Sequence, residues 1–527
     1  MAPGAIHGWQ LNLHRCYSAS VTLQRRLEHD VAFVALLQEP HTFGGLATIN
    51  PSGAAVFQSP VGDGDRNRAT IVISSSLNAW SVPDFTTSDM VTVAMPCSIG
   101  TVWCSSVYMP GDSDEMPPPA LVRCLIQHCE YNGIPLIIGC DANAHNTLWN
   151  STNNNVRGDA LCDYLLSTNL EICNRGHEPT FVVQNRREVL DLTLASLSIA
   201  EEISDWRVDL VPSLSDHRCI RFNLAEHNPT VKVRRNLKRA DWAQFAITSE
   251  SNLAVYKFSK LDTPEELDQT AQSVTSALVS ALDECCPLRT VGFRKVTNSW
   301  WTPELGSLRR HVNSAWNRAH NTDVPSNWEA YRDKKRDYKY RIRRAKRSSW
   351  RNFCSEFENI HDSQRIGKLL KRDKRVQLDV LQKTDGSYTS DPGETLNLMM
   401  SVHYPGSAEI SERRAFRHSE MNWEDQLPGG FITADRVARS IGSFDSLKSP
   451  GEDMISPIVL QRAGSSLVGI LVRLFRASLR MSHVPDTWCG ARAVFIPKPG
   501  KPSYQEAKSF RPITLTSFFL KVLERLE

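Results

Sequence analysis

IPLIIGCDANAHN, residues 134–146, joins a short apolar run to a cluster of polar residues. An uninterrupted apolar run of this length is typical of a strand that is buried on both faces. Asp141 and Asn143 would therefore stand at the end of that strand, where a rigid sheet can hold groups for chemistry. The same pattern occurs in VAFVALLQEP, where Glu39 follows the apolar run that ends at Leu37. Both segments predict carboxylates that project from strand ends of a buried sheet.

Two later segments add to this set. Asp191 lies in EVLDLTLAS, and Ser215, Asp216 and His217 lie between the strand-like runs WRVDLV and RCIRFNL. Four separated segments thus offer hard oxygen ligands and one imidazole. Cleavage of a phosphodiester needs neutralised phosphoryl oxygens, an activated water and assistance to the leaving oxygen. Together these residues predict a metal-dependent phosphodiesterase.

Each carboxylate suits one part of that reaction. Glu39, with Asp216, would hold Mg²⁺, which prefers carboxylate oxygens and keeps several waters. Asp141 would orient or deprotonate the attacking water. Asn143 would donate a hydrogen bond to a phosphoryl oxygen.

The imidazole has a role of its own. His217 would stabilise the charged transition state, with Asp191 fixing its tautomer and orientation from behind. A Ser-His-Asp hydrolase is the competing use of such residues. The sequence has no GxSxG motif, and its acidic residues outnumber those that a triad requires. We therefore favour phosphodiester hydrolysis.

The same residues lie in motifs that resemble a known family. QLNLHRC around Asn12, QEP, RATIVIS near Arg68, VYMP at Tyr108, GCDANAHN, TFVVQNRREVLDLTLAS and SDH resemble the endonuclease/exonuclease/phosphatase superfamily. The resemblance is to the apurinic-endonuclease-like domain in the second open reading frame of insect, jockey-like non-LTR retrotransposons, and it covers roughly the first 224 residues. A single DxN or SDH triplet is most often a capped turn. The motifs carry weight because they occur together and in family order.

The resemblance implies an α/β fold, a sandwich of two mixed sheets flanked by helices. It adds Asn12 near the metal and Tyr108 near the scissile phosphate, with Arg68 and His145 as candidate contacts to nucleic acid. Each has a structural alternative. An Asn after a strand often forms a turn, a Tyr at a strand end is commonly part of the core, and His145 could be a solvated loop residue.

Length and composition indicate more than one domain. The chain has 527 residues, of which 41% are hydrophobic and 23% charged, as in ordinary globular proteins. The net charge of +3 is unevenly distributed, because ten Lys or Arg stand against two Asp between Tyr331 and Arg347. The thirteen cysteines show no zinc spacing, and no apolar run reaches membrane length. We expect a soluble intracellular protein with reduced thiols, no membrane contact, and a nuclear location with the cytoplasm as an alternative.

After the first domain, residues 225–299 form a predicted connector. It includes an amphipathic helix with Leu267, Val274, Leu278 and Leu282 on one face. Residues 300–427 form a predicted helical basic linker region, where aromatic residues interleave with Lys and Arg. The helical spacing of Trp350, Phe353 and Phe357 predicts that these rings are core and that the charges are solvated.

Residues 428–527 carry a second resemblance, which begins upstream with DGSY at Asp385 and HYPG at His403. FDSLKSPGEDMI, VPDTW, AVFIPKPGK and SFRPITLTSFFLKVLERLE resemble the first part, the fingers, of a retrotransposon reverse transcriptase. Lys498, Lys501 and Arg511 match its basic residues that contact template or nucleotide. Nucleotidyl transfer requires palm carboxylates, which usually include an Asp-Asp pair. The sequence has no such pair, so we expect an incomplete polymerase that is inactive in this chain.

The leading hypothesis is a Mg²⁺-dependent DNA endonuclease, with Mn²⁺ as the alternative ion and no small-molecule cofactor. It would nick one strand of duplex DNA and leave a 3′-hydroxyl, which in the family primes reverse transcription of the element RNA. One alternative is an abasic-site nuclease or phosphoesterase of the same fold. Another is a catalytically dead remnant that binds nucleic acid without metal.

Overall fold

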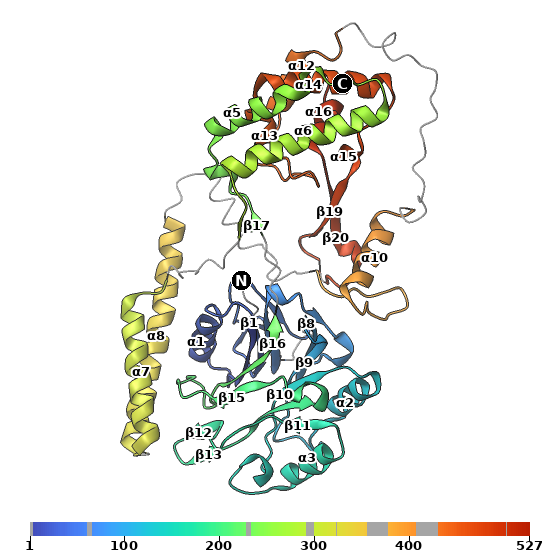
Figure 1. Cartoon of the computed structure of the whole chain (residues 1–527). Helices are drawn as coiled ribbons and strands as arrows, with labels where there is room; N and C mark the ends of the chain where they lie inside the picture. Colours follow the sequence, from blue (N-terminus) through green and yellow to red (C-terminus); the bar gives the residue numbers. More distant parts are fainter. Residues whose placement is uncertain are drawn as a thin grey trace. The chain divides into compact units, whose positions relative to one another are not determined.

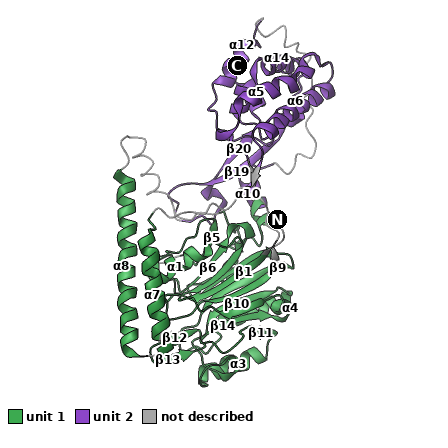
Figure 2. Cartoon of the chain, turned by 60° about the vertical axis from the view of Figure 1, so that its left-hand side comes forward, with its two compact units in different colours: residues 1–230, 293–396 green, residues 231–292, 397–527 purple. Residues whose placement is uncertain are grey.

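The chain forms two compact units in a computed structural model that describes residues 4–60, 66–227, 233–290, 300–322, 324–355, 378–406, 430–501 and 503–526. Unit 1 comprises residues 1–230 and 293–396, and unit 2 comprises residues 231–292 and 397–527 (Figure 2). The chain therefore passes from unit 1 to unit 2 twice. The first passage falls six residues after the predicted boundary at residue 224, and the boundaries at 299 and 427 stay predictions.

Unit 1 is built on two six-stranded sheets (Figure 1). The first has the order β15 (Ser204–Val208), β16 (Ile220–His227), β1 (Gly4–Asn12), β2 (Phe33–Gln38), β6 (Ala69–Ser74) and β5 (Ala54–Phe57). The second has the order β11 (Leu170–Ile172), β14 (Asp191–Ser196), β10 (Leu136–Asp141), β9 (Gly100–Tyr108), β8 (Met90–Cys97) and β7 (Trp80–Ser81). Short hairpins pair β3 (Thr42–Phe43) with β4 (Leu46–Ala47) and β12 (Phe181–Val183) with β13 (Arg186–Glu188).

Both sheets are mixed, which confirms the predicted α/β sandwich. The pair β1 and β2 and the pair β9 and β10 are parallel, and the other pairs in these sheets are antiparallel. The carboxyl ends of a parallel pair meet at one edge of the sheet. In the second sheet, Asp141 lies opposite Tyr108 on one side and Asp191 on the other. The register thus gathers three of the predicted site residues.

A polar layer crosses the interface between the sheets. The Gln10 amide donates to the carbonyls of Cys140 and Leu192 at 3.2 and 3.1 Å, and the Gln38 amide donates to the Gly139 carbonyl at 2.8 Å. A buried amide without a partner costs about 1–3 kcal/mol, so a slip of one sheet against the other would be unfavourable. These bonds fix the two sets of strand ends relative to each other.

Helices cover the outer faces of the sandwich. The second sheet packs against α2 (Ala120–Asn132) and α3 (Val156–Leu166), and α4 (Leu197–Ala200) follows β14. The first sheet packs against α1 (Tyr17–Leu27) and against a hairpin of two long helices, α7 (Pro303–Thr322) and α8 (Pro325–Ser355) (Figure 1). Residues 379–390 also return to the second sheet, where the carboxylate of Asp379 accepts from the Ser81 amide at 3.0 Å.

The α7–α8 hairpin packs against α1 and the first sheet with four buried aromatic side chains, Trp316, Trp328, Tyr331 and Tyr338. The prediction that Trp350 belongs to the core is wrong, because Trp350 is 45% exposed. Helix α8 has 31 residues and α7 has 20, so the end of α8 extends beyond the helix it packs against. Phe353 is partly buried, and Phe357 lies outside the described residues.

Unit 2 is a helical core with one protruding hairpin. The core is formed by α5 (Trp242–Leu253), α6 (Pro264–Cys285), α12 (Ala434–Gly442), α13 (Pro457–Arg462), α14 (Gly464–Arg480), α15 (Asp486–Cys489) and α16 (Phe518–Glu524). The predicted apolar face of α6 is confirmed, since its four residues are 0–1% exposed. The strands β19 (Ala491–Pro497) and β20 (Phe510–Thr516) pair with each other, as do β17 (Val233–Arg234) and β18 (Arg289–Thr290). Helix α10 (Pro392–His403) precedes this part of the chain.

Two predictions about the whole chain can be compared with the described residues. None of the thirteen cysteines, all of which lie in the described ranges, forms a disulfide, and six of them are buried. None of the helices in the described ranges combines the length and apolar composition that a membrane crossing requires.

Candidate active site

A buried carboxylate–imidazole pair stands at the centre of the site. Oδ2 of Asp191, at the start of β14, lies 2.8 Å from Nδ1 of His217, in the loop before β16. The two residues are 1% and 6% exposed. Burial would lower the pKa of His217, but the charges of Asp191, Asp141 and Asp216 outweigh it and raise the pKa to about 9. The ring is therefore an imidazolium at neutral pH, with Nδ1 committed to Asp191.

Asp141 lies on the other side of that ring. Its Oδ2 is 3.9 Å from Nε2 of His217 and accepts a hydrogen bond of 2.7 Å from the side-chain amide of Asn12. Asn12 ends β1 in the first sheet, so this bond joins the two sheets at the site. Burial raises the pKa of the Asp141 carboxyl to about 6, although His217 acts in the opposite direction. A carboxyl of this kind can take up a proton near neutral pH.

The two predicted metal carboxylates each contact a basic side chain. Oε1 of Glu39 lies 2.6 Å from a guanidinium nitrogen of Arg15, and Oδ2 of Asp216 lies 3.0 Å from Nδ1 of His14. His14, Arg15 and Glu39 have φ values of 43°, 53° and 42°. Positive φ is uncommon for such residues and clusters at functional sites. The positive φ values thus turn the loop after β1 so that the side chains of His14 and Arg15 contact Asp216 and Glu39.

The donor set fits a hard divalent cation. Glu39 and Asp216 offer carboxylate oxygens, the ligand type that Mg²⁺ and Mn²⁺ take in proteins. Both carboxylates already contact a basic side chain, Arg15 or His14, and their negative charge would equally attract a metal cation. The Asn12 amide is engaged at both ends, because its oxygen accepts from the His14 backbone amide at 2.7 Å. Asp141, Asp191 and His217 also have ligand atoms within 4.8 Å of one another, but Nδ1 of His217 is bound to Asp191.

Three further predicted residues border this centre. Tyr108 ends β9, and burial followed by the charges of Glu39 and Asp141 raises the pKa of its phenol to about 12. Arg68 makes a double ion pair with Asp89 and lies over the Tyr108 ring, 5.3 Å from its centroid. Arg68 therefore positions Tyr108 in this structure.

Asn143 lies in the loop after β10, with a φ of 43°. Its backbone amide donates to Oδ1 of Asp141 at 3.2 Å, and its side-chain amide donates to the Met109 carbonyl at 3.1 Å. The backbone conformation thus turns the DxN segment back on its own carboxylate. The side chain of Asn143 is held beside Asp141, where the sequence predicts a contact to phosphate.

The remaining predicted residues lie apart from the centre. Nε2 of His145 lies 2.7 Å from a guanidinium nitrogen of Arg186 in β13, and Nδ1 of His145 lies 3.5 Å from a carboxylate oxygen of Glu188. Lys498, Lys501 and Arg511 belong to unit 2, on and beside the β19–β20 hairpin. Their predicted contact with template or nucleotide stays a prediction.

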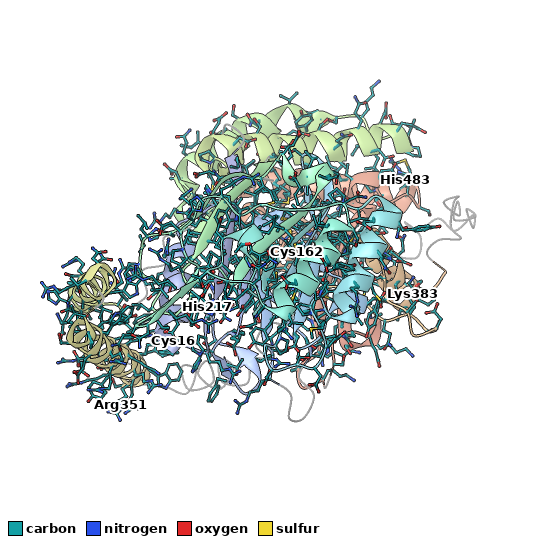
Figure 3. The ribbon with its side chains drawn as sticks, turned by 90° about the horizontal axis from the view of Figure 1, so that it is seen from below. Cys16, Cys162, His217, Arg351, Lys383 and His483 are labelled. Carbon is teal, nitrogen blue, oxygen red and sulfur yellow. The ribbon has the colours of Figure 1, made fainter. Side chains whose placement is uncertain are left out.

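The structure also adds residues that sequence reasoning did not select. His14 and Arg15 follow Asn12 directly, yet a His-Arg pair after a strand carries no signal that its backbone takes positive φ. Phe181 of β12 is a second addition, with its ring centroid 5.0 Å from that of His217. Figure 3 shows His217 and Cys16 on the side of the domain that the α7–α8 hairpin flanks.

The site coincides with a match to known sequences. Residues 102–221 match a protein-family model described as endonuclease-reverse transcriptase. That range contains seven of the predicted site residues, Tyr108, Asp141, Asn143, His145, Asp191, Asp216 and His217.

Two relatives extend the similarity over more of the chain. A retrovirus-related Pol polyprotein from type-1 retrotransposable element R1 of Bradysia coprophila is 27% identical over 416 residues, 74% of this chain and 40% of that protein. A putative 115 kDa protein in type-1 retrotransposable element R1DM of Drosophila melanogaster is 25% identical over 98% of this chain and 51% of that protein. The chain thus spans about half the length of the curated relatives it matches.

Two solved structures are similar to part of the chain. The endonuclease domain of TRAS1, a telomere-specific non-LTR retrotransposon, is 29% identical, with a TM-score of 0.35, over 42% of this chain and 98% of that domain. The AP endonuclease LMAP from Leishmania major is 14% identical, with a TM-score of 0.32, over 43% of this chain and 88% of that protein. The sequence matches confirm the resemblance predicted above.

Proposed function

We propose that this chain, a relative of non-LTR retrotransposon proteins with an endonuclease-type domain, is a Mg²⁺-dependent DNA endonuclease that nicks one strand of a duplex. The observation that carries the proposal is the Asp191–His217–Asp141–Asn12 network. It presents a buried imidazolium and an oriented carboxylate next to Glu39 and Asp216. The reaction is hydrolysis at phosphorus. Water adds, the bond from phosphorus to O3′ breaks, and the products are a 3′-hydroxyl and a 5′-phosphate.

Asp141 is the general base in this proposal. Asn12 donates to one of its oxygens and the Asn143 backbone amide donates to the other. These two bonds orient the carboxylate, which takes the proton of the attacking water. Because burial brings its pKa close to neutral pH, the proton transfer is better matched than it would be for an exposed aspartate.

His217 stabilises the negative charge that grows on the phosphoryl oxygens. Asp191 keeps the ring protonated and fixes its orientation through Nδ1, leaving Nε2–H to donate. Asn143 and Tyr108 border the same space and would donate to the phosphate. Since these donors are held in place before the reaction, little reorganisation is needed when charge develops.

Glu39 and Asp216 would hold the metal ion. When bound, Mg²⁺ supplies positive charge to the phosphoryl and leaving oxygens. Arg15 and His14 would release the two carboxylates to it. Mn²⁺, which takes similar oxygen ligands, is the alternative ion.

Unit 2 would act in reverse transcription of the retrotransposon RNA. Lys498, Lys501 and Arg511 would contact the element RNA or its copy, as the resemblance to polymerase fingers implies. The 3′-hydroxyl made by unit 1 would then serve as a primer. A nuclear location follows, because the target DNA is there.

The test is nicking of supercoiled plasmid by the full chain, with Mg²⁺ or a chelator, next to Asp141→Ala and His217→Ala. We expect metal-dependent open circles that both variants fail to form. Faster cleavage of a duplex with an abasic site than of an intact one would favour the repair-type alternative. DNA binding without cleavage at any metal concentration would favour the inactive remnant and overturn the proposal.

A further inference from the structure

Helix α8 carries a row of cations along one side. Lys335, Lys339, Arg343 and Lys346 follow one another at intervals of four, four and three residues, which places them within about 80° of arc. We call these four residues the α8 stripe. It spans about 17 Å along the helix axis.

The cations of the stripe are not neutralised. Lys335 lies 5.7 Å from the centroid of the Tyr331 ring, and Arg343 and Lys346 lie 5.9 and 4.9 Å from that of Tyr17. Within the described ranges, no carboxylate lies within 4.0 Å of a stripe cation. Aromatic rings attract cations but leave their full charge available to an anion. The stripe therefore keeps four positive charges.

Cations on another side of α8 differ in this respect. Arg341 pairs with Glu304 at 3.3 Å and with Asp337 at 3.5 Å. These pairs are exposed and stabilise the hairpin only slightly, but they reduce the local charge. The stripe is thus a continuous row of four cations without a carboxylate partner among the described residues, beside the buried face of α8, whereas the charge of Arg341 is partly neutralised.

The stripe runs from the neighbourhood of Asp216 toward His41, in the loop that follows Glu39. Lys335 acts electrostatically on Asp216. At the other end, Arg343 and Lys346 lie over Tyr17, whose ring meets the edge of His41 at 5.2 Å, and His41 is two residues from Glu39. All of these residues belong to unit 1. A nucleic acid at the candidate site would therefore pass the stripe.

We propose that the α8 stripe is a track for the sugar-phosphate backbone of the duplex DNA held at the candidate site. The inference rests on the function proposed above and adds the surface that binds the substrate. Duplex DNA has one phosphate per about 3.4 Å of axis on each strand, so the stripe spans about five base pairs. Tyr338 and Ile342, both 0% exposed, fix α8 on the domain. The cations are therefore preorganised, and they contact phosphate without reading sequence.

The test compares two variants of the full chain that lose the same charge. The stripe variant carries Lys335→Gln, Lys339→Gln, Arg343→Gln and Lys346→Gln. The control variant carries Lys334→Gln, Arg341→Gln, Arg344→Gln and Arg347→Gln, on the other sides of α8. Binding of a fluorescent 30-base-pair duplex is measured with chelator between 50 and 200 mM salt, and circular dichroism compares the folds.

We expect the stripe variant to bind about ten- to a hundredfold more weakly at 100 mM salt. The slope of its log affinity against log salt concentration should be less steep by about 3 to 4. Each phosphate contact contributes about 0.9 to that slope, and the variant loses four cations. The control variant should change less than threefold. A third variant, with Lys335→Arg, Lys339→Arg and Lys346→Arg, should bind as the wild type does. Equal losses in the stripe and control variants would overturn the proposal.

DNA binding by the stripe variant and nicking by the wild-type chain are measured separately, so that failure of the track and failure of the nuclease can be distinguished. A wild-type chain that nicks plasmid, together with a stripe variant that binds normally, would refute the track and leave the nuclease. A stripe variant that loses binding while the wild type fails to nick would refute the nuclease and leave the track. Single-stranded RNA of the same length is the competing ligand. A loss confined to that RNA would overturn the assignment to duplex DNA.

Discussion

Replacing Asp191 with asparagine removes one negative charge and preserves the shape of the side chain. The carboxylate is 1% exposed and lies 2.8 Å from Nδ1 of His217. It contributes most to raising the pKa of His217 against burial, from the ordinary 6.5 to about 9. That difference corresponds to about 3 kcal/mol in favour of the imidazolium.

Without this charge, burial has more weight and the pKa of His217 falls. A larger share of the rings is then neutral at pH 7.5, which lowers the rate. Asparagine can also select the wrong tautomer by donating to Nδ1. Loss of an orienting carboxylate of this kind costs up to about 10⁴ in rate. We expect Asp191→Asn to lower the rate of nicking by about 10²- to 10⁴-fold.

The assay is single-turnover nicking between pH 5.5 and 9.5 with saturating Mg²⁺. The wild-type rate should rise as Asp141 loses its proton near pH 6 and fall as His217 loses its proton near pH 9. In Asp191→Asn the falling limb should move to lower pH. Asp209→Asn is the matched control, because Asp209 pairs with Arg26 outside the site. A slow variant whose falling limb stays near pH 9 would refute this account of His217.

Three other outcomes test the structure away from this pair. Arg15→Ala frees the Glu39 carboxylate, so Mn²⁺ should bind about two- to tenfold more tightly by calorimetry; an unchanged affinity would contradict the competition between Arg15 and metal. Gly8→Ala places a Cβ 2.1 Å from the Phe222 ring and should lower the free energy of unfolding by about 3 kcal/mol in urea. Tyr338→Ala should cost about 3–5 kcal/mol of packing and make α8 sensitive to protease, whereas a resistant α8 would show that Tyr338 does not hold the hairpin.

The strand-end residues could be predicted because apolar runs and polar ends are local signals. Asp141 and Glu39 stand where the sequence places them: Asp141 is the last residue of β10, and Glu39 directly follows β2. The distances between them depend on the pairing of β1 with β2 and of β9 with β10, which involves residues far apart in the chain. The order of the motifs along the chain, through the family resemblance, indicated that these distant residues come together. Composition carries no information on which strands pair.

Other parts of the site escaped prediction for physical reasons. His14 and Arg15 reach the carboxylates only because the loop after β1 takes positive φ, which side-chain identity does not specify there. The amphipathic pattern of α8 predicts a buried face, but it does not predict that this face packs against α1 and the first sheet of the same unit. Trp350 has the spacing of a core residue and is exposed because α7 is too short to cover it.

Because unit 2 is made of two separate segments of the chain, its core cannot form until the second segment has been synthesised on the ribosome. Helix α6 is complete at Cys285, yet the helices that complete its core begin after residue 430. About 145 residues must be translated in between, which takes about 7 to 30 s at typical rates of elongation. During that interval the apolar face of α6, including Leu267 and Leu278, has only α5 to cover it. Nascent chains stalled between these points should therefore recruit chaperones, and those stalled before residue 240 should not.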